Sequence, residues 1–161
     1  MQTSITKAPS GTQVGPPGRT TGPRRLIAFA SGSVNYAFQL ACAREVQAWA
    51  GAHPLPCTPL HVRGIINLRG QIVPVIDLRA RLSSVLTDAG EEHVVVIIVI
   101  NQERFGVLVD RIHGIVNVRA EDISPPPTLG DSSLETLFTG IVRDGERLIG
   151  ILDASRIVGK T

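Results

Sequence analysis

Short apolar runs separated by turn residues dominate the chain from Leu26 onward. Runs of about four to eight Val, Ile and Leu residues bounded by Gly, Asp or Asn are typical of β-strands. Asp144-Gly145 between two such runs is a strong hairpin signal. Asp77 and Asp153 are expected to cap two short helices, at residues 78–82 and 154–158. The pattern predicts strands at residues 25–31, 34–40, 45–51, 63–69, 71–77, 93–101, 104–110, 114–118, 137–143 and 146–152.

The order strand, strand, strand, hairpin and short helix occurs twice along the chain. Gly64–Asp77 aligns without gaps on Gly140–Asp153, at an offset of 76 residues, and a weaker repeat at an offset of 69 relates Tyr36–Leu40 to Phe105–Val109. Five short strands in each half suit a small barrel, which closes its own edges. The sequence therefore predicts a mainly β fold of two packed five-stranded barrels. Val94–Ile100 does not alternate polar with apolar residues, so it is expected to be covered on both faces, at the interface between the barrels.

The boundary between the two barrels is expected near residues 83–93, the longest polar-rich gap in the body of the chain. This gives a first barrel at about 25–85 and a second at about 90–158, with exchange of strands between them left open. Residues 1–24 contain four Pro and four Gly and no aromatic residue. Such a stretch buries too little apolar surface to offset its ordering entropy, so it is expected to be a disordered tail, with an expression scar as the weaker alternative.

Charge and length exclude several classes of protein. The 161 residues include 16 basic and 14 acidic ones, and the acid-free first 24 residues hold Lys7, Arg19 and Arg24, which leaves 13 of the basic residues against all of the acidic ones. A near-neutral body argues against nucleic-acid binding. The longest apolar run is far shorter than the roughly 20 residues that span a bilayer. The absence of a secretory signal and the two Cys predict reduced thiols in a cytoplasm.

Metal binding and catalysis find little support in the residues. His53, Cys57 and His61 stand four apart, but the three prolines between them prevent a helix. In an extended segment the outer two would lie about 26 Å apart, too far to share one ion. No serine has the surroundings of a nucleophile elbow, and no glycine-rich phosphate loop with a lysine occurs. We therefore expect no metal site, no catalytic residue and no cofactor.

The predicted hairpin at residues 62–79 holds the polar positions that stand out. Pro74 lies inside a strand, which restricts that part of the strand to an edge or a bulge. Asn67 and Arg69 lie just before the turn, on the same face by the period of two. The plain interpretation is a hairpin with solvated polar tips; the functional one is an edge that presents both side chains to a partner.

This hairpin closely resembles the signature of the CheW family, the chemotaxis coupling proteins. The resemblance lies in Gly64-Ile-Ile-Asn-Leu-Arg-Gly70, then Ile72-Val-Pro74, then Val75-Ile-Asp-Leu-Arg79, and it extends over about residues 25–159. It implies two SH3-like barrels with a hydrophobic interface. It also implies a non-enzymatic adaptor in the cytoplasm, associated with receptor arrays at the inner face of the membrane and without direct membrane insertion.

The implied partners are the regulatory domain of a CheA-type histidine kinase and the cytoplasmic tip of a methyl-accepting chemotaxis receptor. By position, Arg69 and Glu45 match the family's polar pair implicated in coupling, and Asn67 and Val46 accompany them. A second hypothesis keeps the fold and changes the pathway, to a twitching, gliding or other chemosensory array. Two others, from different classes, are a small-barrel nucleic-acid or peptide binder and a cryptic hydrolase.

Overall fold

The computed structural model describes residues 22–159 except 127, 129 and 131. Most of the tail expected to be disordered lies outside the described residues, but the expected boundary at residue 24 is wrong, because Pro23 and Arg24 begin the first strand and pair with Arg119 and Val118. The strands are β1 Pro23–Ser31, β2 Val34–Gln39, β3 Ala43–Ala48, β4 Val62–Leu68, β5 Gln71–Asp77, β6 Val94–Ile100, β7 Glu103–Val109, β8 Arg111–Arg119, β9 Phe138–Asp144 and β10 Arg147–Leu152. The helices are α1 Leu78–Ser83, α2 Ser132–Glu135 and α3 Ala154–Ile157, with single 3-10 turns at Leu40–Cys42 and Ala120–Asp122.

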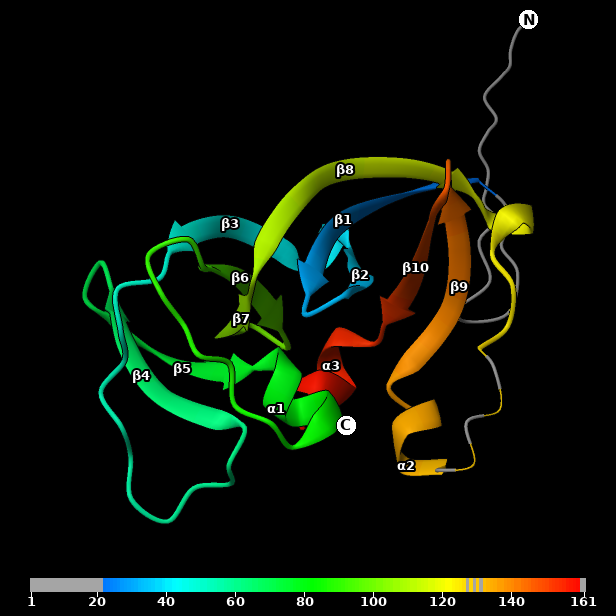
Figure 1. The fold of residues 1–161 in the computed structure, drawn as a ribbon. Helices are drawn as coiled ribbons and strands as arrows, with labels where there is room; N and C mark the ends of the chain where they lie inside the picture. The colour runs from blue at the N-terminus through cyan, green and yellow to red at the C-terminus, as the bar shows by residue number, and fades with distance from the viewer. Residues whose placement is uncertain (1–21, 127, 129, 131, 160–161) are drawn as a thin grey trace, which may run out of the picture.

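The strands form two five-stranded sheets, which confirms the mainly β prediction (Figure 1). The order in the first, called sheet A, is β8-β1-β2-β10-β9, and in the second, called sheet B, it is β3-β6-β7-β5-β4. Neighbours are antiparallel except for two parallel pairs, β2 with β10 and β5 with β7. Both parallel pairs join the second strand of one repeat unit to the hairpin of the other.

The two sheets do not correspond to the two barrels expected at about 25–85 and 90–158. Sheet B is built from one continuous stretch, residues 43–109, whereas sheet A combines residues 23–39 with 111–152. Each repeat unit keeps its first two strands in one sheet and sends its third strand and its hairpin to the other. The repeat in the sequence defines the units but not their pairing, because exchanged strands make the same kinds of ladder hydrogen bonds as unexchanged ones.

A shared apolar core lies between the sheets and joins them. Its largest fully buried side chains from the two sheets include Phe29, Phe38 and Ile98. Along β6, Val96 and Ile98 face this shared core while Val95 and Ile97 face a second core inside sheet B. The strand is therefore covered on both faces at the interface between the sheets, as its unbroken apolar sequence predicts.

The two capping aspartates lie where the sequence predicts them. Asp77 accepts a hydrogen bond from the backbone N–H of Ala80 at the start of α1, and Asp153 accepts from Ser155 and Arg156 at the start of α3. These two helices lie side by side, because the Arg81 guanidinium donates to the carbonyls of Arg156 and Ile157. Within the described residues no helix is long and apolar enough to cross a membrane.

Candidate partner-binding site

The tip of the β4–β5 hairpin presents Arg69. Leu68 pairs with Gln71, so the loop contains only Arg69 and Gly70. The expectation that Arg69 lies in the strand just before the turn is therefore wrong, because Arg69 is the first residue of the turn itself. Both have a positive φ, 51° and 88°, as a two-residue type I′ hairpin requires. The Asn67 side-chain oxygen accepts a hydrogen bond from the Gly70 backbone N–H at 2.8 Å. This tight turn fixes the direction in which the Arg69 side chain leaves the sheet.

The Arg69 guanidinium binds the Glu45 carboxylate through two hydrogen bonds. One joins Nη1 to Oε1 at 3.0 Å, and the other joins Nη2 to Oε2. The Arg69 side chain is 62% exposed and the Glu45 side chain 26%, so the pair lies at the surface with the carboxylate partly covered. A two-pronged contact of this kind fixes the orientation of both groups, which a single contact would not.

Hydrogen bonding favours the charged state of both members of the pair. The bonds from Arg69, followed by a 2.6 Å bond from the Gln47 amide to Oε1, lower the pKa of the Glu45 carboxyl. The same contact with Glu45 raises the pKa of Arg69. The site therefore presents a fully ionised pair at neutral pH, with three of the five guanidinium N–H groups left to solvent or to a partner.

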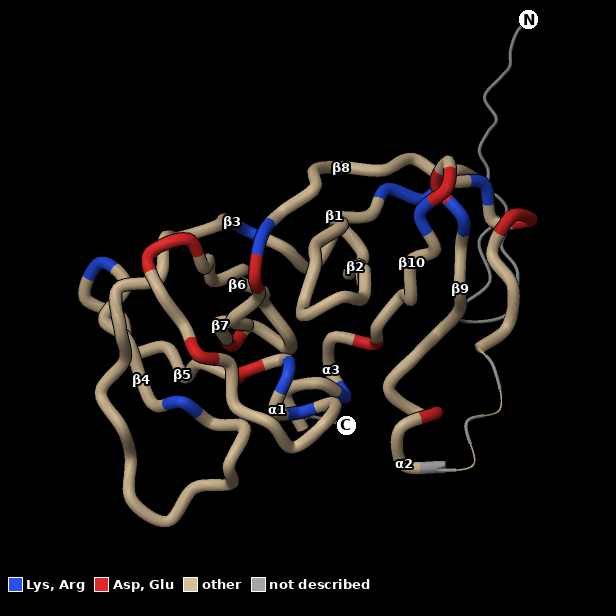
Figure 2. Tube along the Cα trace, viewed as in Figure 1, with Lys and Arg blue, Asp and Glu red and all other residues tan. Residues whose placement is uncertain are grey.

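The pair joins the two edges of sheet B. Glu45 lies on β3, one edge strand, and Arg69 follows β4, the other edge strand. Beside the pair, the gap between the edges holds a hollow of about 380 Å³, whose lining includes Gln47, Trp49 and Leu68. Figure 2 shows a blue, basic segment at the tip of the β4–β5 hairpin, at one end of the molecule. The ion pair thus closes one end of an otherwise open barrel seam.

Backbone contacts close the other end of the seam. His53 and Ile65 form an isolated antiparallel bridge, with N–H to carbonyl distances of 2.8 and 2.9 Å. Gly64 has a φ of 139°, and a Cβ built there would lie 2.1 Å from the His53 carbonyl oxygen. Only glycine allows this approach of the two backbones. The first glycine of the family-like hairpin motif thus has a structural role in sealing sheet B.

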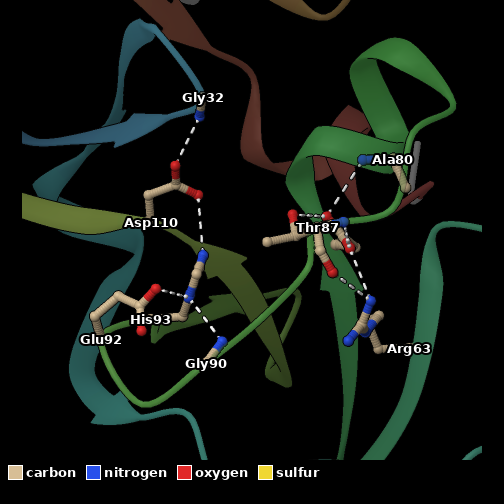
Figure 3. Close-up of polar contacts among 9 residues, drawn as sticks. Gly32, Arg63, Ala80, Thr87, Gly90, Glu92, His93 and Asp110 are labelled. Carbon is tan, nitrogen blue, oxygen red and sulfur yellow. Dashed lines mark hydrogen bonds and ion pairs between the residues drawn. The ribbon is translucent and has the colours of Figure 1, made fainter.

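A polar network that the sequence did not predict holds Trp49, one of the residues that line the hollow. The Arg63 guanidinium carbon lies 5.4 Å from the centre of the Trp49 ring, within cation–π range. Arg63 also donates to the Asp77 carboxylate at 3.3 Å and to the Thr87 carbonyl at 3.0 Å. Asp77 is fully buried and accepts two further bonds from Thr87, at 2.8 and 2.7 Å (Figure 3). Trp49 is therefore held in place by a residue of β4.

The structure brings three of the four expected site residues together. Arg69, Glu45 and Asn67 meet at the hairpin tip, with Asn67 engaged in the turn itself. Val46 alternates with Glu45 along β3, so its 41% exposed side chain points to the opposite face of the strand. A partner that contacts Arg69 would reach Val46 only by wrapping around the edge of sheet B.

The remaining candidate ligands do not come together as a metal site. His53 is engaged by its backbone in the bridge to Ile65, and Cys57 is exposed. Among the residues that the structure describes, no group of three or more His, Cys, Asp or Glu side chains could hold a metal ion.

Comparison with known proteins gives matches over nearly the whole body of the chain. Residues 25–161 match the family described as the CheW-like domain. A "Probable chemotaxis protein CheW" of Rhizobium etli is 34% identical over 141 residues, which cover 87% of this chain and 90% of that protein. The "Chemotaxis protein CheW" of Rhizobium meliloti is 30% identical over 86% of this chain and 89% of its own length.

A solved structure has the same fold. The crystal structure of the scaffolding protein TtCheW from Thermoanaerobacter tengcongensis superposes with a TM-score of 0.74 at 28% sequence identity. The match covers 81% of this chain and 89% of that one. The solved protein therefore shares the overall fold of this chain.

Proposed function

The chain belongs to the CheW-like domain family, and from that premise we propose that it is an adaptor of bacterial chemotaxis that couples chemoreceptors to a CheA-type histidine kinase. The observation that carries the proposal is the match to relatives named as chemotaxis proteins along nine-tenths of their own length. The solved relative is named a scaffolding protein, and scaffolding needs no catalytic group.

The proposed partners are the regulatory domain of the kinase and the cytoplasmic tip of a receptor. The paired Arg69 and Glu45 support a contact at the free edges of sheet B, because an oriented ion pair at the surface offers both a donor fork and a carboxylate to a partner. The adaptor would then work in the cytoplasm, beside receptors at the inner face of the membrane.

The mechanism follows from linkage between binding equilibria. An adaptor bound to both partners transmits a signal when its contacts differ between the receptor's signalling states. The size of the effect on the kinase cannot exceed the difference in contact free energy between those states. The adaptor therefore needs surfaces whose relative position is fixed.

Reconstitution tests the proposal. The chain is mixed with a CheA-type kinase from the same source and with a receptor cytoplasmic fragment, and kinase autophosphorylation and co-sedimentation are measured. We expect a ternary complex whose kinase activity changes with the receptor's modification state. A chain that binds neither partner, or that leaves kinase activity insensitive to the receptor, would contradict the proposal.

A further inference from the structure

Asp110 occupies the point where the chain passes from sheet B to sheet A. It is the single residue between Val109, the last residue of β7, and Arg111, the first of β8. Its backbone N–H donates to the carbonyl of Ala30 on β1 at 2.9 Å, so its main chain already belongs to sheet A. The chain therefore leaves sheet B and enters sheet A within this one residue.

The Asp110 carboxylate contacts both sheets (Figure 3). Its Oδ2 accepts a 2.9 Å hydrogen bond from the backbone N–H of Gly32, in the turn between β1 and β2 of sheet A. Its Oδ1 lies 3.5 Å from Nε2 of His93, the residue before β6 of sheet B. One side chain thus links two segments that lie 61 residues apart in the sequence, on opposite sides of the crossing.

His93 is fixed on the sheet B side. Its side chain is only 9% exposed, and Nδ1 accepts a hydrogen bond from the Gly90 backbone N–H at 3.0 Å. In the neutral ring the proton then lies on Nε2, the nitrogen that faces Asp110. The His93 carbonyl accepts from the backbone N–H of Trp49 at 3.0 Å, which ties His93 to the end of β3.

The chain passes between the sheets at another point, and that crossing is built differently. From β2 to β3 the chain makes the 3-10 turn Leu40–Cys42, whose Leu40 and Cys42 side chains pack on the shared apolar core. The apolar driving force is non-directional, so this crossing constrains the angle between the sheets only through the shapes of the packed side chains. At Asp110 the hydrogen bond from the Gly32 N–H is directional, and the 3.5 Å contact with the His93 ring adds a polar contact on the sheet B side.

We propose that Asp110 is a positioning residue that sets the orientation of sheet A relative to sheet B, and that receptor control of the kinase depends on this orientation. The second half rests on the proposed function. A partner that contacts both sheets senses the angle between them, whereas a partner on one sheet does not. Loss of the carboxylate would then uncouple the receptor while each single-sheet contact, including that at Arg69, remains.

A distance measurement between the sheets tests the first half. Spin labels are placed at Gln71→Cys, the first residue of β5 in sheet B, and at Glu146→Cys, in the turn between β9 and β10 of sheet A. Both positions are exposed, and the background carries Cys42→Ser and Cys57→Ser. We expect one narrow distance distribution in this background, a clearly broadened one with Asp110→Ala, and an intermediate one with Asp110→Asn, which keeps an acceptor for the Gly32 N–H.

Asp122→Ala is the matched control, because the Asp122 carboxylate pairs with Arg119 within sheet A and its neighbouring turn. It should leave the distribution unchanged. A distribution with Asp110→Ala as narrow as that of the background would overturn the proposal, since the apolar core and the Arg81 bonds between α1 and α3 would then be enough to orient the sheets. Broadening with Asp122→Ala as well would overturn it too, because the effect would not be specific to the crossing.

Kinase assays on the unlabelled chain test the second half. With Asp110→Ala we expect kinase binding to be retained and the response to the receptor to be reduced, with partial recovery in Asp110→Asn. Broadened distances with an intact receptor response would overturn the link between orientation and control. If the unmodified chain itself shows no receptor response, the proposed function fails, while the distance measurement still decides the role of Asp110.

Discussion

At the scale of single residues, Arg69 combines a strained backbone conformation with a two-pronged contact between its guanidinium and one carboxylate. A positive φ is unfavourable for a residue with a Cβ, and here the type I′ turn imposes it. The planar guanidinium bonds both oxygens of Glu45, whereas a lysine ammonium is a point charge that cannot engage them in the same way. The side-chain type therefore matters beyond its charge.

We predict that Arg69→Ala leaves the melting temperature close to that of the parent chain and abolishes or strongly weakens receptor control of the kinase. Exposed ion pairs contribute little to stability, so a functional loss would arise from the lost contact. Arg69→Lys should be impaired less than Arg69→Ala. The measurements are a melting curve and kinase activity in the reconstituted assembly for each variant.

A titration of Glu45 checks that each variant changes the pair as intended. The bonds from Arg69 lower the pKa of Glu45, so Arg69→Ala should move its titration toward higher pH, which NMR of the carboxyl carbon measures. The sign for stability follows: the pair's contribution is present above the pKa of Glu45 in the unfolded chain and is lost as pH falls through the folded value. Normal receptor control with Arg69→Ala would remove the coupling role, and a collapse of the melting temperature would assign Arg69 to structure.

The two cysteines should differ sharply in reactivity. Burial raises the pKa of the Cys42 thiol to about 11, and its S–H donates to the Gln39 carbonyl at 3.1 Å. Cys57 is exposed. Because the thiolate is the reactive form, Ellman's reagent at about pH 8 should label one thiol per chain quickly. Cys57→Ser should remove the fast phase, and a fast phase that persists in this variant would show that Cys42 is accessible.

At the scale of elements, the two aspartates that cap helices differ in burial and in the number of their partners. Asp77 and Asp153 occupy the same place in the repeat, yet Asp77 is fully buried and also binds Thr87 and Arg63, whereas the Asp153 side chain is 31% exposed. The same residue type thus caps a helix at both places and anchors a buried network at only one.

We predict that Asp77→Ala costs about 3–5 kcal/mol of unfolding free energy, since it leaves part of Arg63 without its charged partner. Asp153→Ala should cost about 1 kcal/mol, the usual value of an N-cap. Urea unfolding of both variants measures the difference. Equal losses would mean that the network around Asp77 adds nothing beyond the cap.

The elements themselves were largely predictable, and the contacts between them were not. Periodicity and turn residues indicated the strands and both Asp-capped helices, because those signals are local in the sequence. The stacking of Arg63 on Trp49 and the link from His93 to Asp110 join segments whose spacing carries no pattern. The resemblance indicated Arg69 and Glu45 as site residues, but only the structure shows that they bind each other.

At the scale of the whole molecule, the exchanged strands make each half dependent on the other. Sheet A takes β1 and β2 from the first repeat unit and β8, β9 and β10 from the second, and the core between the sheets receives side chains from both. Neither half therefore contains a complete sheet, and each would expose unpaired strand edges on its own.

We predict that residues 22–90 and 91–161 do not fold when each is expressed alone, and that the intact chain unfolds in one cooperative transition. Calorimetry of the intact chain and amide NMR spectra of each half measure this. A dispersed spectrum from either half alone, or two separate calorimetric transitions, would contradict it. Mixing the halves should restore at least part of the native spectrum, since the exchanged strands can then pair.

In the sequence, the stretch that forms sheet B, residues 43–109, lies between the two stretches that form sheet A, residues 23–39 and 111–152. During synthesis on the ribosome, residues 43–109 can therefore assemble before the chain is complete. The hairpin of β1 and β2 is synthesised first, but its neighbours in the sheet come late. β1 pairs with β8, and β2 pairs with β10, whose last residue is Leu152. The first strands to be synthesised are therefore among the last to gain their neighbours. The nascent chain carries an apolar hairpin with two unpaired outer edges for most of its synthesis.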